Sequence, residues 1–139
     1  MELISFAQSE TAEGEVVYSF AVAARPWTVN SERASNRFER AKKTKAWRTF
    51  FADRAEMFHV MRLTQARVEV TLVLKGMLQD TAACMPAVKA AIDGLVDGGM
   101  FSDDTGEHVE AITFRAPERG RDNAITLTVM GFAVDASPE

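Results

Sequence analysis

Residues 66–74 constrain the fold of this chain more tightly than any other segment. The even positions from 68 to 74 all hold Val or Leu, and the odd positions hold Arg, Glu, Thr and Val. Side chains of a β-strand alternate between two faces, so this pattern predicts a strand with one face buried. Such a strand needs neighbouring strands and a covering layer, which together predict a sheet packed on one side.

Further segments supply the other strands. Residues 15–23 are rich in β-branched and aromatic side chains, and we expect them to pair with residues 3–7 across a turn at Gly14. Residues 109–115 and 124–134 predict two more strands, joined by a connection rich in Pro, Gly, Arg, Asp and Asn.

Two segments predict helices. In residues 37–58, apolar side chains recur at spacings near three and four, the period of an amphipathic helix that packs on a sheet. This apolar stripe is Phe38, Ala41, Trp47, Phe50, Phe51, Ala55 and Phe58. A second helix is expected to begin at Pro86, a favoured first-turn residue, and to end at Gly98-Gly99. Its inward residues would be Val88, Ala91, Ile92, Leu95 and Val96.

The order of the predicted elements indicates the fold class. Arg25-Pro26 interrupts strand pairing because proline has no N–H, and residues 27–36 are expected to form a loop. The order is then β(β)αβαββ, with no internal repeat. It predicts a mixed α/β (α+β) two-layer domain with both helices on one face of the sheet.

Length and composition suit a single domain of residues 1–139. Residues 1–14 would form an N-terminal extension or an extra strand, and residues 135–139 a frayed tail. Cys84 is the only cysteine, which excludes an intrachain disulfide and suits a reducing compartment. No apolar segment is long enough to cross a bilayer, so a soluble, cytoplasmic protein is expected.

Charge is distributed unevenly along the chain. The net charge is −4, yet one segment is strongly basic, with Arg25, Arg33, Arg37, Arg40, Lys42, Lys43, Lys45, Arg48 and Arg54. Acidic residues concentrate between Asp93 and Glu110. This distribution suits an enzyme that acts on a polyanion through a cation, and it equally suits ordinary surface charge. Four of the basic residues are spaced as a helical row that suits phosphate contacts, namely Arg33, Arg37, Arg40 and Lys43.

Aspartates next to the predicted strands are candidate metal ligands. Asp80 follows one strand, and Asp103-Asp104 precede another, so we expect them to converge at one end of the sheet. Mg²⁺ prefers such oxygen ligands, and Lys89 would reach a phosphate oxygen. The same aspartates also suit turns, for local hydrogen-bonding reasons, and Lys89 is spaced to form a surface ion pair with Asp93.

Other chemically distinctive side chains favour structural roles. Trp47 fits the apolar stripe of the first helix, whereas Trp27, next to Pro26, suits either packing or stacking on a base. His59 and His108 are isolated in the sequence. Cys84 lies near a helix start, but no histidine base lies near it in the sequence, which argues against cysteine catalysis.

One longer pattern resembles a known family. Residues 86–99 read Pro-Ala-Val-Lys-Ala-Ala-Ile-Asp-Gly-Leu-Val-Asp-Gly-Gly, followed by Asp103-Asp104 and His108-Val109. This resembles the core signature of RusA-like Holliday-junction resolvases, especially those encoded by phages of actinobacteria. Residues 25–30 and 40–48 resemble the N-terminal loop and first helix of that family. The resemblance extends over roughly residues 18–129.

The resemblance implies a homodimeric endodeoxyribonuclease that cuts four-way (Holliday) DNA junctions with Mg²⁺, or Mn²⁺ in its place. By position, Lys89 matches the helix lysine of the family. The catalytic residues would be Asp80, Lys89, Asp103 and Asp104, and the metal ligands Asp80, Asp103 and Asp104. The DNA-binding residues would be Arg25, Asn30, Arg33, Arg40, Lys43, Arg48 and Lys75.

The chain departs from the family at the loop before the second helix. The family has Asp-x-Asp-Asn or Asp-Pro-x-Asn there, whereas residues 80–85 read Asp-Thr-Ala-Ala-Cys-Met, with Ala83 in place of the asparagine. The arginine cluster that usually precedes this loop is reduced to Lys75. Two hypotheses follow: an active junction endonuclease, or a catalytically degenerate relative that binds branched DNA or a protein partner without cutting it.

Overall fold

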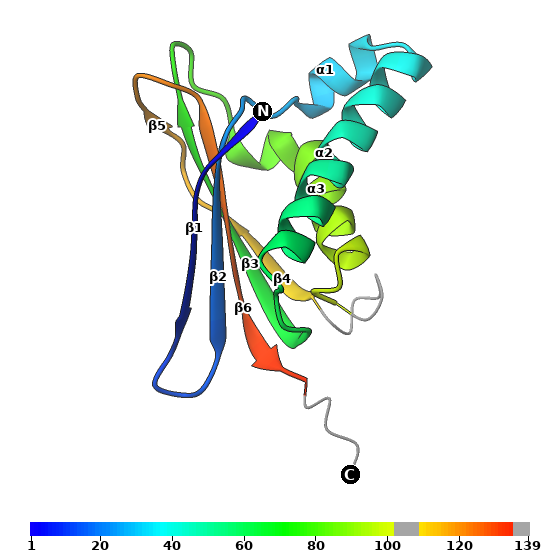
Figure 1. Cartoon of the computed structure of the whole chain (residues 1–139). Helices are drawn as coiled ribbons and strands as arrows, with labels where there is room; N and C mark the ends of the chain where they lie inside the picture. Colours follow the sequence, from blue (N-terminus) through cyan, green and yellow to red (C-terminus); the bar gives the residue numbers. More distant parts are fainter. Residues whose placement is uncertain (102–108, 135–139) are drawn as a thin grey trace.

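A mixed six-stranded sheet forms the centre of the computed structural model, which describes residues 1–101 and 109–134 (Figure 1). The strands are β1 (Glu2–Glu10), β2 (Val16–Ala23), β3 (Leu63–Leu74), β4 (Val109–Phe114), β5 (Glu118–Arg119) and β6 (Ala124–Ala133). Except for the two-residue β5, each overlaps a segment that the sequence predicts as a strand. Gly14, with φ of 91°, lies in the turn that joins β1 to β2, as expected.

The order of the strands determines which residues share an end of the sheet. It runs β1-β2-β6-β3-β4, and β5 also pairs with β3. β1, β2, β6 and β3 are antiparallel to their neighbours, whereas β4 and β5 run parallel to β3. β2, β3 and β5 therefore all finish at the same end, which is uppermost in Figure 1 and is called the upper end below.

The helices lie on one face of the sheet, which confirms the predicted two-layer arrangement (Figure 1). They are α1 (Val29–Ala34), α2 (Arg37–Met57), the short 3₁₀ helix η1 (Thr81–Cys84) and α3 (Met85–Asp97). Between α2, α3 and the sheet lies the core, to which β2 and β3 contribute alternate residues, namely Val16, Tyr18, Phe20, Val22, Val68, Val70, Leu72 and Leu74. None of the described helices is both long and apolar enough to cross a membrane.

The loop predicted for residues 27–36 is wrong in part, because α1 occupies residues 29–34 in its middle. A capping box then starts α2: the Asn36 side chain accepts a hydrogen bond from Glu39 N (2.9 Å), and the Glu39 side chain accepts one from Asn36 N (3.2 Å). Since α2 begins at this cap, Arg33 belongs to a separate helix. The expected helical row from Arg33 to Lys43 is therefore broken.

The apolar stripe predicted for α2 is correct only in the second half of the helix. Trp47, Phe50, Phe51 and Ala55 are buried, whereas Phe38 is 84% exposed and Ala41 is exposed. Phe38 precedes Trp47 by nine residues, or two and a half turns, so the two side chains point to opposite sides. The helix also tilts away from the sheet toward its N-terminal end (Figure 1).

Small residues allow α2 and α3 to approach closely. A Cβ on Gly94 would collide with the carbonyl oxygen of Arg48, and one on Gly98 would lie 2.7 Å from the carbonyl oxygen of Ala52. α3 begins with Pro86 in its first turn and ends at Gly98, as predicted. Its expected inward residues Val88, Ala91 and Leu95 are buried, and Ile92 and Val96 are partly buried.

Candidate nucleic-acid interface

Basic residues gather at the upper end of the molecule. Arg25 follows β2, Lys75 follows β3, and Arg119 and Arg121 lie at and just after the end of β5; these four form the sheet-end cluster. On α1 and the first half of α2 lies the helix cluster, which consists of Arg33, Arg37, Arg40, Lys42, Lys43 and Lys45. The two clusters together contain ten of the sixteen Lys and Arg residues of the chain.

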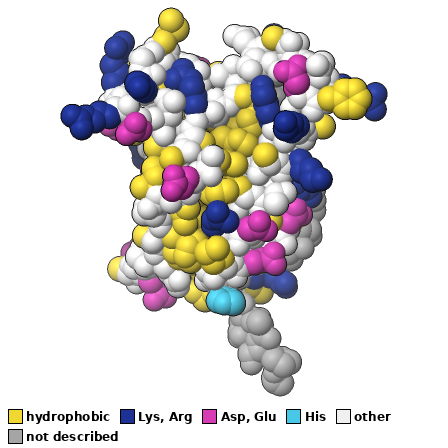
Figure 2. All heavy atoms as spheres, turned by 45° about the horizontal axis from the view of Figure 1, so that its top comes forward, with side chains coloured by type: hydrophobic (Ala, Val, Ile, Leu, Met, Phe, Trp, Pro, Cys, Tyr) yellow, Lys and Arg dark blue, Asp and Glu magenta, His cyan; other side chains and the backbone are white. Residues whose placement is uncertain are grey.

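The two clusters lie on opposite sides of an apolar surface. Figure 2, which brings the upper end forward, shows Lys and Arg side chains on both sides of this end, with hydrophobic side chains between them. Cations on both sides suit contacts with more than one stretch of phosphate backbone. The apolar surface between them suits contact with exposed faces of bases.

Arg25 belongs to the sheet-end cluster but also organises it. Its guanidinium donates hydrogen bonds to the backbone oxygens of Lys75 (3.3 Å) and Met77 (3.1 Å), and to side-chain oxygens of Gln79 (3.3 Å) and Asn123 (3.4 Å). The Asn123 side chain accepts a second hydrogen bond from Lys75 N (2.9 Å). Arg25, proposed from the sequence as a DNA contact, therefore holds together the loops that present Lys75 and Arg121.

Two residues of the helix cluster brace the corner between α1 and α2. Arg40 donates to the backbone oxygen of Ser35 (2.8 Å), and Lys43 donates to the Ser35 hydroxyl (3.4 Å). Both side chains are half-buried, because they face the α1–α2 corner. Lys42 and Lys45, which the DNA-binding prediction omits, are exposed on the opposite face of α2.

Arg48, also predicted to bind DNA, joins α2 to α3. Its Nε lies 2.5 Å from Asp97 Oδ2, and its Nη2 lies 3.0 Å from Asp97 Oδ1, a bidentate pair. The hydrogen bonds from this guanidinium hold the pKa of Asp97 below its usual value. The remaining predicted contacts, Asn30, Arg33 and Lys75, are exposed at the upper end.

The predicted metal ligands are only partly described. Asp80 is exposed, and its carboxylate accepts a hydrogen bond from Ala82 N (3.2 Å) as the cap of η1. Asp103 and Asp104, together with His108, lie outside the described residues. Lys89 lies 3.2 Å from Asp93 Oδ1, so the predicted surface ion pair is present.

The described residues that come just before and just after Asp103 and Asp104 in the sequence lie at the other end of α3 from Asp80. Asp80 precedes this helix and Phe101 follows it, and its 13 residues span about 20 Å. Val109, the next described residue, pairs with Ala66 near the start of β3, whereas Asp80 follows the end of that strand. Among the described residues, no three His, Cys, Asp or Glu side chains gather to hold a metal. A shared Mg²⁺ site therefore stays a prediction.

The remaining chemically distinctive residues have structural surroundings. Trp27, left open by the sequence between packing and base stacking, is only 8% exposed and meets Trp47 edge-on, with ring centroids 5.5 Å apart. Trp47 is buried, as predicted. Cys84 is fully buried and its Sγ accepts a hydrogen bond from Gln79 (3.2 Å); burial raises the pKa of this thiol. His59 is exposed.

Comparison with known proteins adds no relative. No family model matches this chain, and no curated protein sequence matches it significantly. The resemblance to RusA-like resolvases thus rests on the residues quoted above, and the functions that it implies are proposals.

Proposed function

We propose that this protein binds branched DNA, in the manner of a RusA-like Holliday-junction protein, through the two basic clusters at the upper end. The observation that carries this proposal is the placement of ten of the sixteen Lys and Arg residues at one end of a chain whose net charge is −4. A net acidic protein that concentrates its cations on one surface favours a local polyanionic partner over general adhesion to anions.

The shape of this surface favours a branched substrate over a single linear duplex. Phosphate contacts orient a nucleic acid without reading its sequence, and the two clusters offer such contacts on two sides. In a duplex the base pairs are stacked and do not expose their faces, so the apolar surface between the clusters would not contact them. At a branch point, where stacking is interrupted, it would contact base faces.

Mg²⁺-dependent cleavage of the junction is the second candidate function. Asp80 supports it, because this exposed carboxylate follows Gln79, which Arg25 holds within the sheet-end cluster. The ion would neutralise charge on a scissile phosphate and activate water, while Lys89 would contact the phosphate. The resemblance adds Asp103 and Asp104 as ligands, but the residues on either side of them lie at the other end of α3, which does not favour one ion held by all three aspartates. Ala83, which replaces the family's asparagine, removes one oxygen ligand, and this favours weak cleavage or none.

The resemblance to RusA-like resolvases also implies an oligomeric state and a cellular location. The protein would act as a homodimer, so that two copies contact symmetric arms of a four-way junction. Its location would be the cytoplasm of a bacterium infected by the phage that encodes it. Size measurement of the protein with and without junction DNA tests the stoichiometry.

The experiment that tests both functions uses a labelled four-way junction with no metal, with Mg²⁺ and with Mn²⁺. We expect a salt-sensitive complex in all three conditions. Cleavage by the natural chain and its loss in Asp104→Asn would support the enzyme, whereas binding without cleavage would support the degenerate relative. Failure to bind junction DNA at low salt would overturn the DNA-binding proposal and point to a protein partner.

A further inference from the structure

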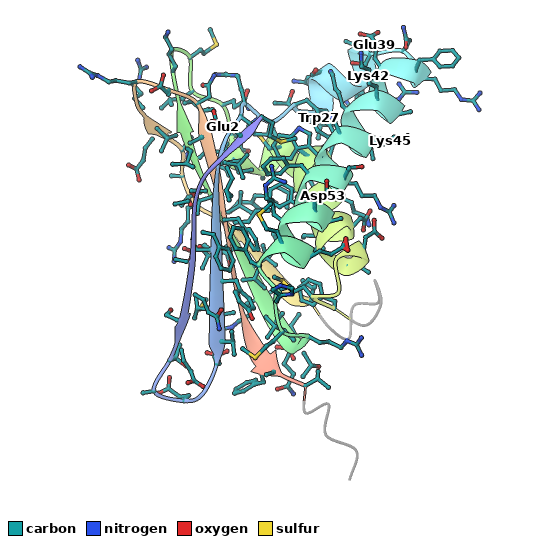
Figure 3. All side chains as sticks on the ribbon, viewed as in Figure 1. Glu2, Trp27, Glu39, Lys42, Lys45 and Asp53 are labelled. Atoms are coloured by element: carbon teal, nitrogen blue, oxygen red, sulfur yellow. The ribbon has the colours of Figure 1, made fainter. Side chains whose placement is uncertain are left out.

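The outer face of α2 carries a groove that extends from Lys42 and Lys45 of the helix cluster toward the second half of the helix. It is a shallow groove, open to solvent, with a volume of about 470 Å³ between the start of the chain and the helix. Its lining residues are Met1, Lys42, Lys45, Ala46, Thr49, Phe50, Asp53 and Arg54. Lys42, Lys45 and Asp53 follow one another along this side of α2 (Figure 3). The groove is therefore apolar at its base and charged along its rim.

A planar group forms the base of the groove, and the lysines on its rim have no partner among the described residues. The Arg54 guanidinium lies 4.2 Å from the centre of the Phe50 ring, which forms a stacked cation–π pair. Within the described residues, the ammonium groups of Lys42 and Lys45 form neither an ion pair nor a hydrogen bond. Both lysines therefore remain able to contact an anionic ligand.

Phe38 extends the same face beyond the groove. The spacing from Phe38 to Lys42, Lys45 and Thr49 is four, three and four residues, so these side chains form one stripe on the helix. An aromatic ring that is 84% exposed, on a helix already fixed by its capping box, contributes little to the core. Phe38 therefore leaves an aromatic face available to a ligand beside Lys42 and Lys45.

The chemistry of the stripe selects nucleotides over other anions. The exposed Phe38 ring and the Arg54 guanidinium, which covers the largely buried Phe50 ring, offer flat surfaces to bases, and Lys42 and Lys45 offer charge to the phosphates between them. The Asp53 carboxylate on the same rim can accept a hydrogen bond from the exocyclic amino group of adenine, cytosine or guanine, a contact that a simple anion does not offer. Base pairs in an intact duplex hide their faces, so the ligand that fits is an unpaired strand.

We propose that the outer face of α2 binds a short unpaired segment of a DNA strand. One base stacks on Phe38, Lys42 and Lys45 contact the phosphates that follow, and a base several nucleotides further along the strand enters the groove and stacks on the Arg54 guanidinium, since Phe38 and Arg54 are about 24 Å apart along the helix. This inference rests on the proposed function, because unpaired nucleotides are what a branched DNA offers and a linear duplex lacks.

The experiment uses Phe38→Trp as a fluorescent reporter in the full chain. Addition of a single-stranded oligodeoxycytidylate, whose bases carry an exocyclic amino group, is expected to quench the emission of the new indole, because the indole stacks on a base. Duplex DNA of equal length is expected to leave the emission unchanged. The natural chain, whose Trp27 and Trp47 are buried, is the spectroscopic control.

Affinity for the same oligonucleotide tests the contribution of each residue. Phe38→Ala should weaken binding roughly five- to a hundredfold, the effect of losing one stacked base, and Phe38→Tyr should retain it. Lys42→Gln with Lys45→Gln should reduce the slope of log affinity against log salt by about 1.4, at about 0.7 per phosphate on a single strand. Met57→Ala, an exposed apolar residue at the far end of α2, is the matched control and should bind like the natural chain.

The outcomes separate this inference from the proposed function. Absence of quenching, or unchanged affinity in Phe38→Ala, while the four-way junction still binds, would overturn the inference and leave the function standing. If the natural chain bound neither the single strand nor the four-way junction, the inference and the proposed function would both be overturned. Circular dichroism confirms that the variants fold, which is expected because the substituted side chains are exposed.

Discussion

The basic residues of the upper end differ in what their side chains contact. Arg25, Arg40 and Lys43 donate to oxygens of the protein, whereas Lys42 and Lys45 have no such partner among the described residues. The residues that donate to the protein hold its loops and helices in place, whereas Lys42 and Lys45 are available to a ligand. The sequence could predict the charge of each residue but not this difference, because the acceptors of Arg25 lie about 50 or more positions away.

Substitution of Arg25 tests this difference. Arg25→Gln is expected to lower the free energy of unfolding by about 1–2 kcal/mol, because several charged hydrogen bonds are lost together. Arg119→Gln, an exposed cation of the same cluster, should change it by less than about 0.5 kcal/mol. Urea unfolding measures both values. Equal effects of the two substitutions would contradict the structural role of Arg25.

The single thiol provides a second test at the residue scale. Burial raises the pKa of Cys84 and outweighs the opposing hydrogen bond from Gln79, so the thiol stays protonated near neutral pH. In the native protein at pH 8, Cys84 should react with a disulfide reagent far more slowly than in urea. Reaction as fast as that of a free cysteine would contradict the burial of this residue.

The contact between α2 and α3 determines stability at the scale of elements. Helix propensity alone predicts that Gly94→Ala stabilises α3 by about 1 kcal/mol. The structure predicts the opposite sign, because the new methyl group would collide with the backbone of α2 at Arg48. We expect a loss of roughly 1–3 kcal/mol, the usual cost of overpacking, measured by urea unfolding. A more stable variant would show that the helices are further apart.

The ion pair between the same helices gives a pH dependence. The pKa of Asp97 is lowered in the folded protein, so the pair stabilises the fold above the pKa of the unfolded state, and this contribution disappears as pH falls through the lower folded value. Asp97→Asn should therefore lower the Tm at pH 6, and the difference from the natural chain should shrink below about pH 4. Arg48→Gln should lower the Tm by a similar amount. The variant with both substitutions should have a Tm no lower than that of either single variant, because the two residues form one ion pair. A difference that does not depend on pH would exclude the pair as its cause.

Local patterns predict some elements of this fold and fail for others. β3 and α3 are predictable because period and caps are both present in the sequence, with Pro86 and Gly98 marking the ends of α3. β5, with two residues, is too short to show a period, and α1 lies within a segment that reads as a loop. The exposed half of α2 is not predictable, because the sequence does not show where the helix leaves the sheet.

The candidate site is a property of the whole molecule. Arg25, Lys75 and Arg119 come together only because β2, β3 and β5 finish at the same end of the sheet. The sequence pattern places Phe38 in the buried stripe of α2. For this reason it does not predict that Phe38 is exposed on the same face as Lys42 and Lys45. Topology and the direction of one helix thus determine the interface, and neither follows from composition.

Salt dependence tests whether the sheet-end cluster contacts phosphates. Arg119→Gln with Arg121→Gln should weaken junction binding and reduce the slope of log affinity against log salt by about 2, or about one per phosphate contact. Arg62→Gln, an exposed arginine just before β3 at the opposite end, is the matched control and should leave the slope unchanged. Equal effects of both changes would indicate that net charge, and not this surface, governs binding.

Selectivity for branched DNA is the central claim, and competition binding measures it most directly. A labelled four-way junction bound to the protein would be displaced by an unlabelled junction or by a linear duplex with the same base composition and total length, at fixed salt and without metal. We predict that the junction competes at a concentration at least tenfold lower than the duplex. Equal competition by the two DNAs, or no complex at low salt, would contradict the account.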